Sequence, residues 1–137
     1  MEDNMIEKAL QDEIEPSKQE ITVMKANITK EMNKLLKIFE SADVNVQKIV
    51  KPLIENAAYM KCELKRLKEY NVEHGVKEFY QNGKGQWGYK ESVESKTYNT
   101  MIKNYSSIIK QLNDYLPAGK KIDPEEDDDF DDFCNGW

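Results

Sequence analysis

The chain has 137 residues, of which 39% are hydrophobic and 34% are charged, and it carries a net charge of −6. This length fits one compact domain with a modest core, and small helical proteins of this composition often complete their burial by oligomerising. No stretch approaches the roughly 20 apolar residues needed to span a membrane. The first ten residues hold three acids and one lysine, which is the wrong charge for a secretory leader. We therefore expect an intracellular protein that makes no membrane contact.

The two cysteines, Cys62 and Cys134, lie in different contexts, one in a periodic helical segment and the other in an acidic tail. A disulfide between them is not expected. Together with the single histidine they are too few for a four-ligand zinc site. The sequence predicts no metal site and no cofactor.

The net charge hides a segregation along the chain. Residues 1–40 carry −3, residues 41–121 carry +5 and residues 122–137 carry −8. The overall charge argues against a nucleic-acid partner, whereas the charge of the central body does not.

The pattern of the N-terminal third predicts one long helix. Residues 1–16 are expected to form a frayed segment, because Pro16 ends a weak apolar repeat. Ser17 and Glu20 form a capping-box pattern, and a helix over 18–40 follows it. Its apolar residues recur every three or four positions: Ile21, Met24, Ile28, Met32, Leu35 and Phe39.

A second helix is predicted to start after Asp43 and to end at His74-Gly75. Pro52 interrupts it, so we expect either a bend at the proline or a short turn before it. Its predicted core stripe consists of Val46, Ile49, Leu53, Ala57, Met60, Leu64 and Leu67.

The segment from Val76 to Trp87 is rich in aromatic residues and surrounds an Asn-Gly turn, which predicts a small β-hairpin or an ordered loop. Trp87 is expected to pack onto the helices that this connector joins. A base-stacking role for its ring is the alternative.

Ser92 is expected to cap a third helix, which Pro117 and Gly119 terminate. Its broad apolar stripe is typical of a helix packed in a bundle or between subunits. The candidate oligomer interface on this stripe is Tyr98, Met101, Tyr105, Ile108 and Leu112.

The predicted fold is mainly α: a bundle of three main helices, a short hairpin or ordered loop between the last two, and a disordered acidic tail. We divide the chain into a frayed segment (1–16), a helical core domain (17–121) and a flexible tail (122–137). The tail combines eight acids with aromatic residues. It is either a solubilising segment or a partner-binding one. In the second case its anchors are Phe130, Phe133 and Trp137.

No catalytic pattern is present in the sequence. The cluster Gly83-Lys84-Gly85 lacks the spacing and the hydroxyl of a phosphate loop. The lone histidine, His74, stands at a helix end, where a capping role is favoured over that of a general base. We expect a binding protein rather than an enzyme.

Rows of lysines on two predicted helices are the candidate DNA-binding residues. One row lies on the second helix and the other on the third, and such rows can follow phosphates. With Arg66 as the only arginine, little base-specific readout is expected. An ordinary solvated helix face is the alternative. The candidates are Lys61, Lys65, Lys68, Lys96, Lys103 and Lys110.

The stretch from Leu53 to Leu116 resembles a phage terminase small-subunit family of tailed phages and prophages of Gram-positive bacteria. Three segments carry the resemblance in order: LIENAAYMKCELKRLKEYNVEHG, EFYQNGKGQWGYKES and YNTMIKNYSSIIKQLNDYLP. The acidic tail with its Asp-Phe pairs is also similar. No helix-turn-helix is evident in the N-terminal third, so the place of the DNA site stays open.

The resemblance implies a protein of the host bacterial cytoplasm that assembles as a ring and binds phage double-stranded DNA at the packaging site. It also implies delivery of that DNA to the terminase large subunit, which holds the ATPase and nuclease. A non-catalytic phage assembly adaptor, such as a scaffolding or head-completion protein without DNA binding, is the main alternative. A host regulatory protein whose tail imitates the charge of DNA is a second one.

Overall fold

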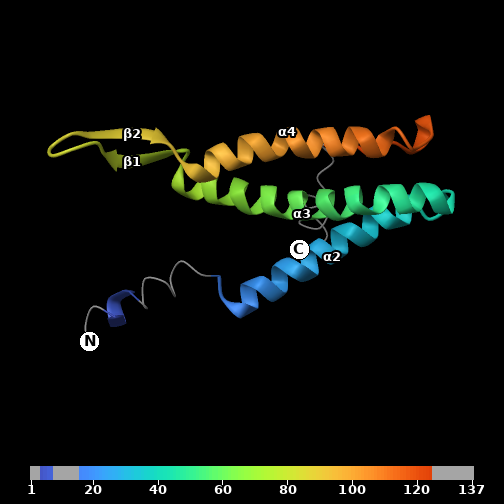
Figure 1. Cartoon of the computed structure of the whole chain (residues 1–137), viewed down its shortest axis with the longest axis horizontal. Helices are drawn as coiled ribbons and strands as arrows, with labels where there is room; N and C mark the ends of the chain where they lie inside the picture. Colours follow the sequence, from blue (N-terminus) through green and yellow to red (C-terminus); the bar gives the residue numbers. More distant parts are fainter. Residues whose placement is uncertain (1–3, 8–15, 125–137) are drawn as a thin grey trace, which may run out of the picture.

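The computed structural model describes residues 4–7 and 16–124. Three long helices dominate it: α2 (Lys18–Ile38), α3 (Val44–His74) and α4 (Val93–Asn113). The strands β1 (Lys77–Gln81) and β2 (Trp87–Glu91) form an antiparallel hairpin between α3 and α4, and a short 3-10 helix, η1 (Ala118–Lys120), follows α4 (Figure 1). The predicted mainly helical fold, with a hairpin between its last two long helices, is confirmed.

Two predicted segments fall largely outside the described residues. Of the N-terminal segment, residues 4–7 form one helical turn. Most of the acidic tail, including Phe130, Phe133 and Trp137, lies beyond residue 124, so its predicted role stays a prediction.

The capping box at the start of α2 is present. The Ser17 hydroxyl accepts a hydrogen bond from the Glu20 amide at 3.1 Å, and the Ser17 amide donates to the Glu20 carboxylate at 3.0 Å. These two bonds satisfy amides that a helix start leaves unpaired. The helix ends at Ile38, two residues earlier than predicted.

A glutamine fixes the connection between α2 and α3. The Gln47 amide group donates to the carbonyl oxygens of Phe39, Glu40 and Ala42 at 3.1 to 3.2 Å. The Asp43 carboxylate accepts from the Asn45 amide at 2.9 Å and caps α3, as predicted.

Helix α3 runs as one element through Pro52. A proline inside a helix removes a backbone hydrogen bond, which normally costs about 3 kcal/mol. Val50 and Ile54, on either side of it, are both fully buried, so core packing offsets that loss. The helix ends where Gly75 adopts a φ of +79°, a conformation that glycine reaches without strain.

The main core lies at the end of the molecule where α2 leads into α3. Helix α3 is central, and both α2 and α4 pack against it. Met32, Leu35, Tyr105 and Ile108 are partly buried around this core. Its fully enclosed residues are Phe39, Val50, Ile54, Ala57, Ile109 and Leu112.

The predicted stripes hold only in part. On α3, Ile49 is 52% exposed, because the core side of the helix passes through Val50 and Ile54 instead. On α2, the N-terminal half diverges from α3 (Figure 1), and Ile21 is 40% exposed. The periodicity locates an apolar face but does not reveal how far along a helix a partner continues.

The hairpin extends beyond the helices at the end opposite the main core (Figure 1). Phe79 pairs with Tyr89, and Gln81 pairs with Trp87. The expectation that Trp87 packs onto the helices is wrong: its ring is 59% exposed and stacks on Phe79. The register explains this, because Trp87 belongs to the strand pair farthest from the helices.

Side-chain hydrogen bonds of Ser92 and Asn113 fix the two ends of α4. The Ser92 hydroxyl accepts from the Ser95 amide at 3.1 Å in a buried site, which confirms the predicted cap. The Asn113 side chain exchanges two hydrogen bonds with the backbone of Ile122, at 2.7 and 2.9 Å, and folds the following segment back onto α4. Among the helices that the structure describes, none has the length and apolar character required to cross a bilayer.

Candidate nucleic-acid interface

The lysines of α4 form one row on the side of the helix that faces away from α3. Lys96, Lys103 and Lys110 are all exposed. Seven residues correspond to nearly two helical turns, so successive lysines lie on one face about 10.5 Å apart along the axis. The residues that pack toward α3, including Tyr105 and Leu112, lie on the opposite side. We call the surface formed by these three lysines and the polar residues between them the α4 lysine face.

The residues between these lysines are uncharged hydrogen-bonding groups. Thr100, Asn104 and Ser107 lie between the lysines, Gln111 follows Lys110, and all four are exposed. Glu94 is the single acidic residue within Val93–Asn113. Hydroxyl, amide and ammonium groups are the side chains that most often bind phosphate oxygens in protein–DNA contacts. The α4 lysine face therefore has the donors that a polyanion requires, and the acid nearest to it is Asp114 at the C-terminal end of the helix.

No carboxylate of the described residues forms a salt bridge with an α4 lysine. Within residues 16–124, none of the three forms a salt bridge. An unpaired ammonium group exchanges its counterions for a phosphate without first breaking an internal bond. These three lysines are therefore available to a ligand.

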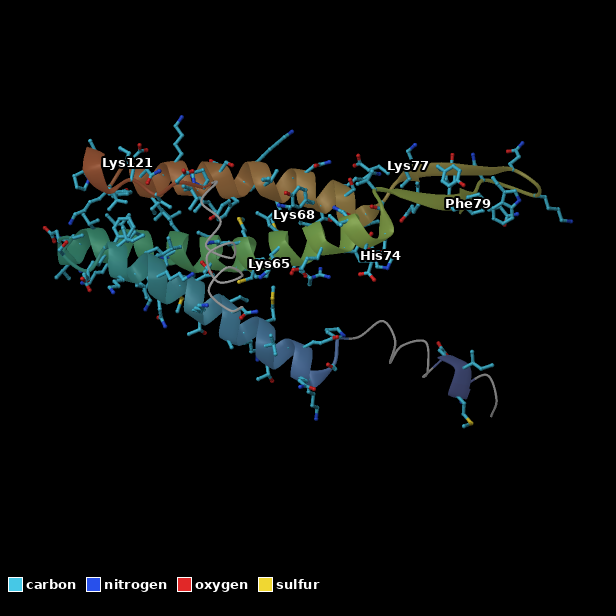
Figure 2. The ribbon with its side chains drawn as sticks, turned by 180° about the vertical axis from the view of Figure 1, so that it is seen from behind. Lys65, Lys68, His74, Lys77, Phe79 and Lys121 are labelled. Carbon is cyan, nitrogen blue, oxygen red and sulfur yellow. The ribbon has the colours of Figure 1, made fainter. Side chains whose placement is uncertain are left out.

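The lysines of α3 are in a different situation. Lys61 is partly buried, and its ammonium group lies 3.1 Å from the Glu31 carboxylate of α2. Lys65 and Lys68 are exposed and project from the part of α3 between the main core and the hairpin (Figure 2). Because the α4 lysine face is directed away from α3, the two predicted rows do not form one continuous surface.

The single arginine has an internal partner. The Arg66 guanidinium bonds to the Glu63 carboxylate one turn earlier, with Nε 3.1 Å from one carboxylate oxygen. This side-chain hydrogen bond, together with the nearby charge, raises the pKa of Arg66 above its ordinary value despite the opposing effect of burial. Arg66 therefore stays charged and stays bonded to Glu63.

The residues predicted to join subunits lie mostly within the chain's own packing. Leu112 is completely buried in the main core, while Tyr105 and Ile108 pack against that core. Tyr98 and Met101 are half-buried. The apolar groups of α4 that remain open to a neighbour are Val93 at 63% and Ile102 at 39% exposure.

His74 is placed at the end of α3, as expected. Its ring stacks on Tyr70 with centroids 4.1 Å apart, and Nδ1 lies 3.1 Å from the Tyr70 carbonyl oxygen. This arrangement anchors the last turn of the helix.

Phe79 and Tyr89 were not among the functional residues expected from the sequence. In the structure they form an exposed aromatic cluster with Trp87 on the hairpin. Alternation along two strands of known register would have placed all three on one face.

Within residues 4–7 and 16–124, no group of three or more His, Cys, Asp or Glu side chains is arranged to hold a metal ion. Comparisons with models of protein families, with curated proteins and with solved structures find no match for this chain.

Proposed function

We propose that this chain is a small terminase subunit, which oligomerises, binds phage double-stranded DNA at the packaging site and recruits or regulates the large ATPase and nuclease subunit. The α4 lysine face, with three lysines that form no salt bridge within residues 16–124 and with its uncharged donors, is the observation that carries the DNA-binding part of this proposal. The terminase part rests on the resemblance of residues 53–116. The proposed setting is the host bacterial cytoplasm, and the chain itself acts without catalysis.

Binding in this account is electrostatic and weak for each copy. Each lysine that contacts a phosphate releases counterions and contributes affinity without reading the sequence. Arg66, the residue type best suited to a bidentate contact with guanine, is paired with Glu63. Recognition of a packaging site then relies on many copies acting together and on the shape of the DNA.

Oligomerisation in this account uses surfaces other than the buried side of α4. The N-terminal half of α2 exposes Ile21 and leaves Met24 and Ile28 half-buried. A stripe of this kind on a diverging helix suits a contact with a neighbouring subunit, and a repeated head-to-tail contact that closes forms a ring.

Light scattering combined with DNA binding tests the proposal. The full chain and a version ending at Ile122 are measured alone and with a labelled duplex carrying a packaging-site end, at two salt concentrations. We expect a discrete oligomer that binds the duplex more weakly at the higher salt concentration, and tighter binding once the acidic tail is removed. A monomer or dimer that ignores the duplex at both salt concentrations would contradict the proposal.

A phage assembly adaptor that binds protein rather than DNA is the second candidate. The exposed apolar groups on α2 and on the hairpin favour it, because exposed patches of this kind often mark protein interfaces. Oligomerisation without any salt-dependent DNA affinity would support the adaptor over the terminase subunit.

A further inference from the structure

Three aromatic rings form a connected cluster on one face of the hairpin. The rings of Phe79 and Trp87 are stacked with centroids 4.8 Å apart and planes 11° from parallel. Tyr89 meets Phe79 edge-on at 5.4 Å. Although their rings contact one another, the residues Phe79, Trp87 and Tyr89 are 56%, 59% and 71% exposed respectively. Figure 2 shows Phe79 on the hairpin arm, away from the helical body.

The opposite face of the hairpin is closed by its own side chains. The Tyr80 ring lies over Gly88, where an added Cβ would come within 3.1 Å of it. Lys90 forms a salt bridge with Glu78 at 3.1 Å and lies 5.8 Å from the centre of the Tyr80 ring. The side chains on this face of the hairpin therefore contact one another. The other face, which carries Phe79, Trp87 and Tyr89 and which we call the aromatic face, stays exposed and is the candidate for a ligand.

Charge on and beside the aromatic face favours an anionic ligand. Lys77 lies on the same face by register, and Lys84 lies in the turn. Neither lysine forms a salt bridge within the described residues. The turn contributes no acid, and Glu91 at the base of the hairpin is the single carboxylate on this face. An acidic protein surface is one such ligand, but a nucleic-acid strand carries a flat ring beside every phosphate and so matches the rings and the cations together.

Trp87 provides the open end of the ring stack. Phe79 covers one side of the Trp87 ring, and within residues 16–124 no other ring contacts the remaining side. Trp87 also belongs to the strand pair next to the turn, so Lys84 and the side-chain amides of Asn82 and Gln86 are close in sequence to that open side. A flat ring attached to a phosphate backbone matches both the open ring face and the nearby cations.

We infer that the aromatic face of the hairpin is a binding site for single-stranded DNA, in which an unpaired base stacks on Trp87 and Lys77 and Lys84 contact the adjacent phosphates. Every base has a π-face, so such a site tolerates any sequence. This inference goes beyond the proposed binding of duplex DNA and does not require it, because the hairpin site and the α4 lysine face share no residue.

Tryptophan fluorescence gives a direct test in the full chain. Trp137→Phe leaves Trp87 as the only tryptophan. This protein is titrated with a ten-nucleotide oligothymidylate, with an abasic strand of the same length and with a duplex. We expect the oligothymidylate to quench the Trp87 emission. For variants that lack Trp87, the affinity is read instead from the fluorescence anisotropy of a dye-labelled oligothymidylate. Stacking contributes enough that Trp87→Ala should weaken its binding about 5- to 150-fold.

Matched variants separate stacking from charge and from misfolding. Trp87→Phe keeps a ring and should retain most of the affinity, and Tyr59→Ala removes an exposed aromatic side chain from α3 and should leave it unchanged. The abasic strand should bind weakly and should be insensitive to Trp87→Ala. Circular dichroism confirms that the helices persist in each variant.

Two results would overturn the inference. One is an oligothymidylate affinity that Trp87→Ala leaves unchanged. The other is a fall in oligomer mass on Trp87→Ala while the affinity of the chain for the strand is retained, which would identify the aromatic face as a subunit contact. Loss of duplex binding on mutation of the α4 lysines alone, with strand binding unaffected, concerns the proposed function and leaves this inference standing.

Discussion

Lys61 on α3 and Glu31 on α2 form a salt bridge between helices, with the ammonium nitrogen 3.1 Å from the carboxylate oxygen. Glu31 also accepts a bond from Lys34 one turn later at 3.4 Å. The side chain of Glu31 is only 16% exposed, so this carboxylate contributes to the contact between α2 and α3 rather than to a solvated surface.

We predict that Lys61→Ala reduces stability and leaves DNA affinity almost unchanged. A partly exposed ion pair contributes about 0.2 to 1 kcal/mol, so the loss should lie in that range. Urea unfolding measures the stability, and a duplex titration measures the affinity. Glu31→Ala should give a similar loss, and the double variant should lose less than the sum of the two. A large fall in DNA affinity with intact stability would place Lys61 at the DNA surface instead.

A buried isoleucine should dominate the stability of the main core. Ile54 is completely enclosed, and Ile54→Ala should cost about 2 to 5 kcal/mol because it opens a cavity. Ile49→Ala removes the same atoms from the same helix at a position that is 52% exposed, and it should cost less than about 1 kcal/mol. Thermal unfolding of both variants checks the contrast. Equal losses would mean that the core side of α3 is misassigned.

The cap of α4 should also be measurable. Ser92→Ala removes the hydroxyl that accepts from the Ser95 amide, and in this buried site the loss should be about 1 to 2 kcal/mol. Ser106→Ala, on the exposed side of the same helix, serves as the control and should change stability by less than about 0.5 kcal/mol. Urea unfolding distinguishes the two. A neutral Ser92→Ala would show that the cap does not stabilise α4.

The exposed stripe of α2 should control the size of the oligomer. Ile21→Glu places a charge on the apolar side of the diverging half of α2, outside the main core, and should lower the mass measured by light scattering while the helical content is retained. Val23→Glu introduces the same charge about 160° away around the same helix and should leave the mass unchanged. An equal effect of both substitutions, or of neither, would exclude this stripe as the subunit contact.

The starts of the three long helices and the end of α3 were predictable because they depend on neighbouring residues, whereas α2 and α4 end earlier than predicted. Each of the predictable helix termini is set by residues that bond only a few positions away, and each of those residues stands where the sequence pattern placed it. They are Ser17 with Glu20, Asp43, Ser92 and Gly75. The hairpin followed from an Asn-Gly turn between aromatic segments in the same way.

What the sequence did not reveal depends on contacts between distant segments. The sequence left open whether the second helix bends at Pro52 or follows a short turn before it, and the burial of Val50 and Ile54 against other helices supports the continuous helix. The bond between Lys61 and Glu31 joins residues thirty positions apart, and no local spacing predicts it. The exposure of Trp87 follows from its place at the far end of the hairpin rather than from its neighbours in sequence.

For the candidate site, periodicity placed Lys96, Lys103 and Lys110 on one exposed face, and the structure agrees. It also grouped Lys61 with them as a DNA-binding candidate, although Lys61 lies against α2. The apolar stripe of α4 led us to expect Leu112 at a subunit interface, whereas that side chain lies in the core of its own chain. Periodicity identifies a face of a helix, and only tertiary packing determines what covers it.

The most direct test of the account is the salt dependence of duplex binding by the natural chain and by the triple variant Lys96→Ala, Lys103→Ala, Lys110→Ala. Affinity falls as salt rises, and each lost phosphate contact makes the negative slope of log affinity against log salt shallower by about 0.9, so the loss of three contacts should make it shallower by about 2.7. The control, Lys18→Ala, Lys25→Ala, Lys37→Ala, removes the same charge from exposed positions on α2 and should leave the slope nearly unchanged. An equal change of slope in both variants would show that the effect comes from net charge alone. An unchanged slope in the α4 variant would contradict the assignment of DNA binding to this face.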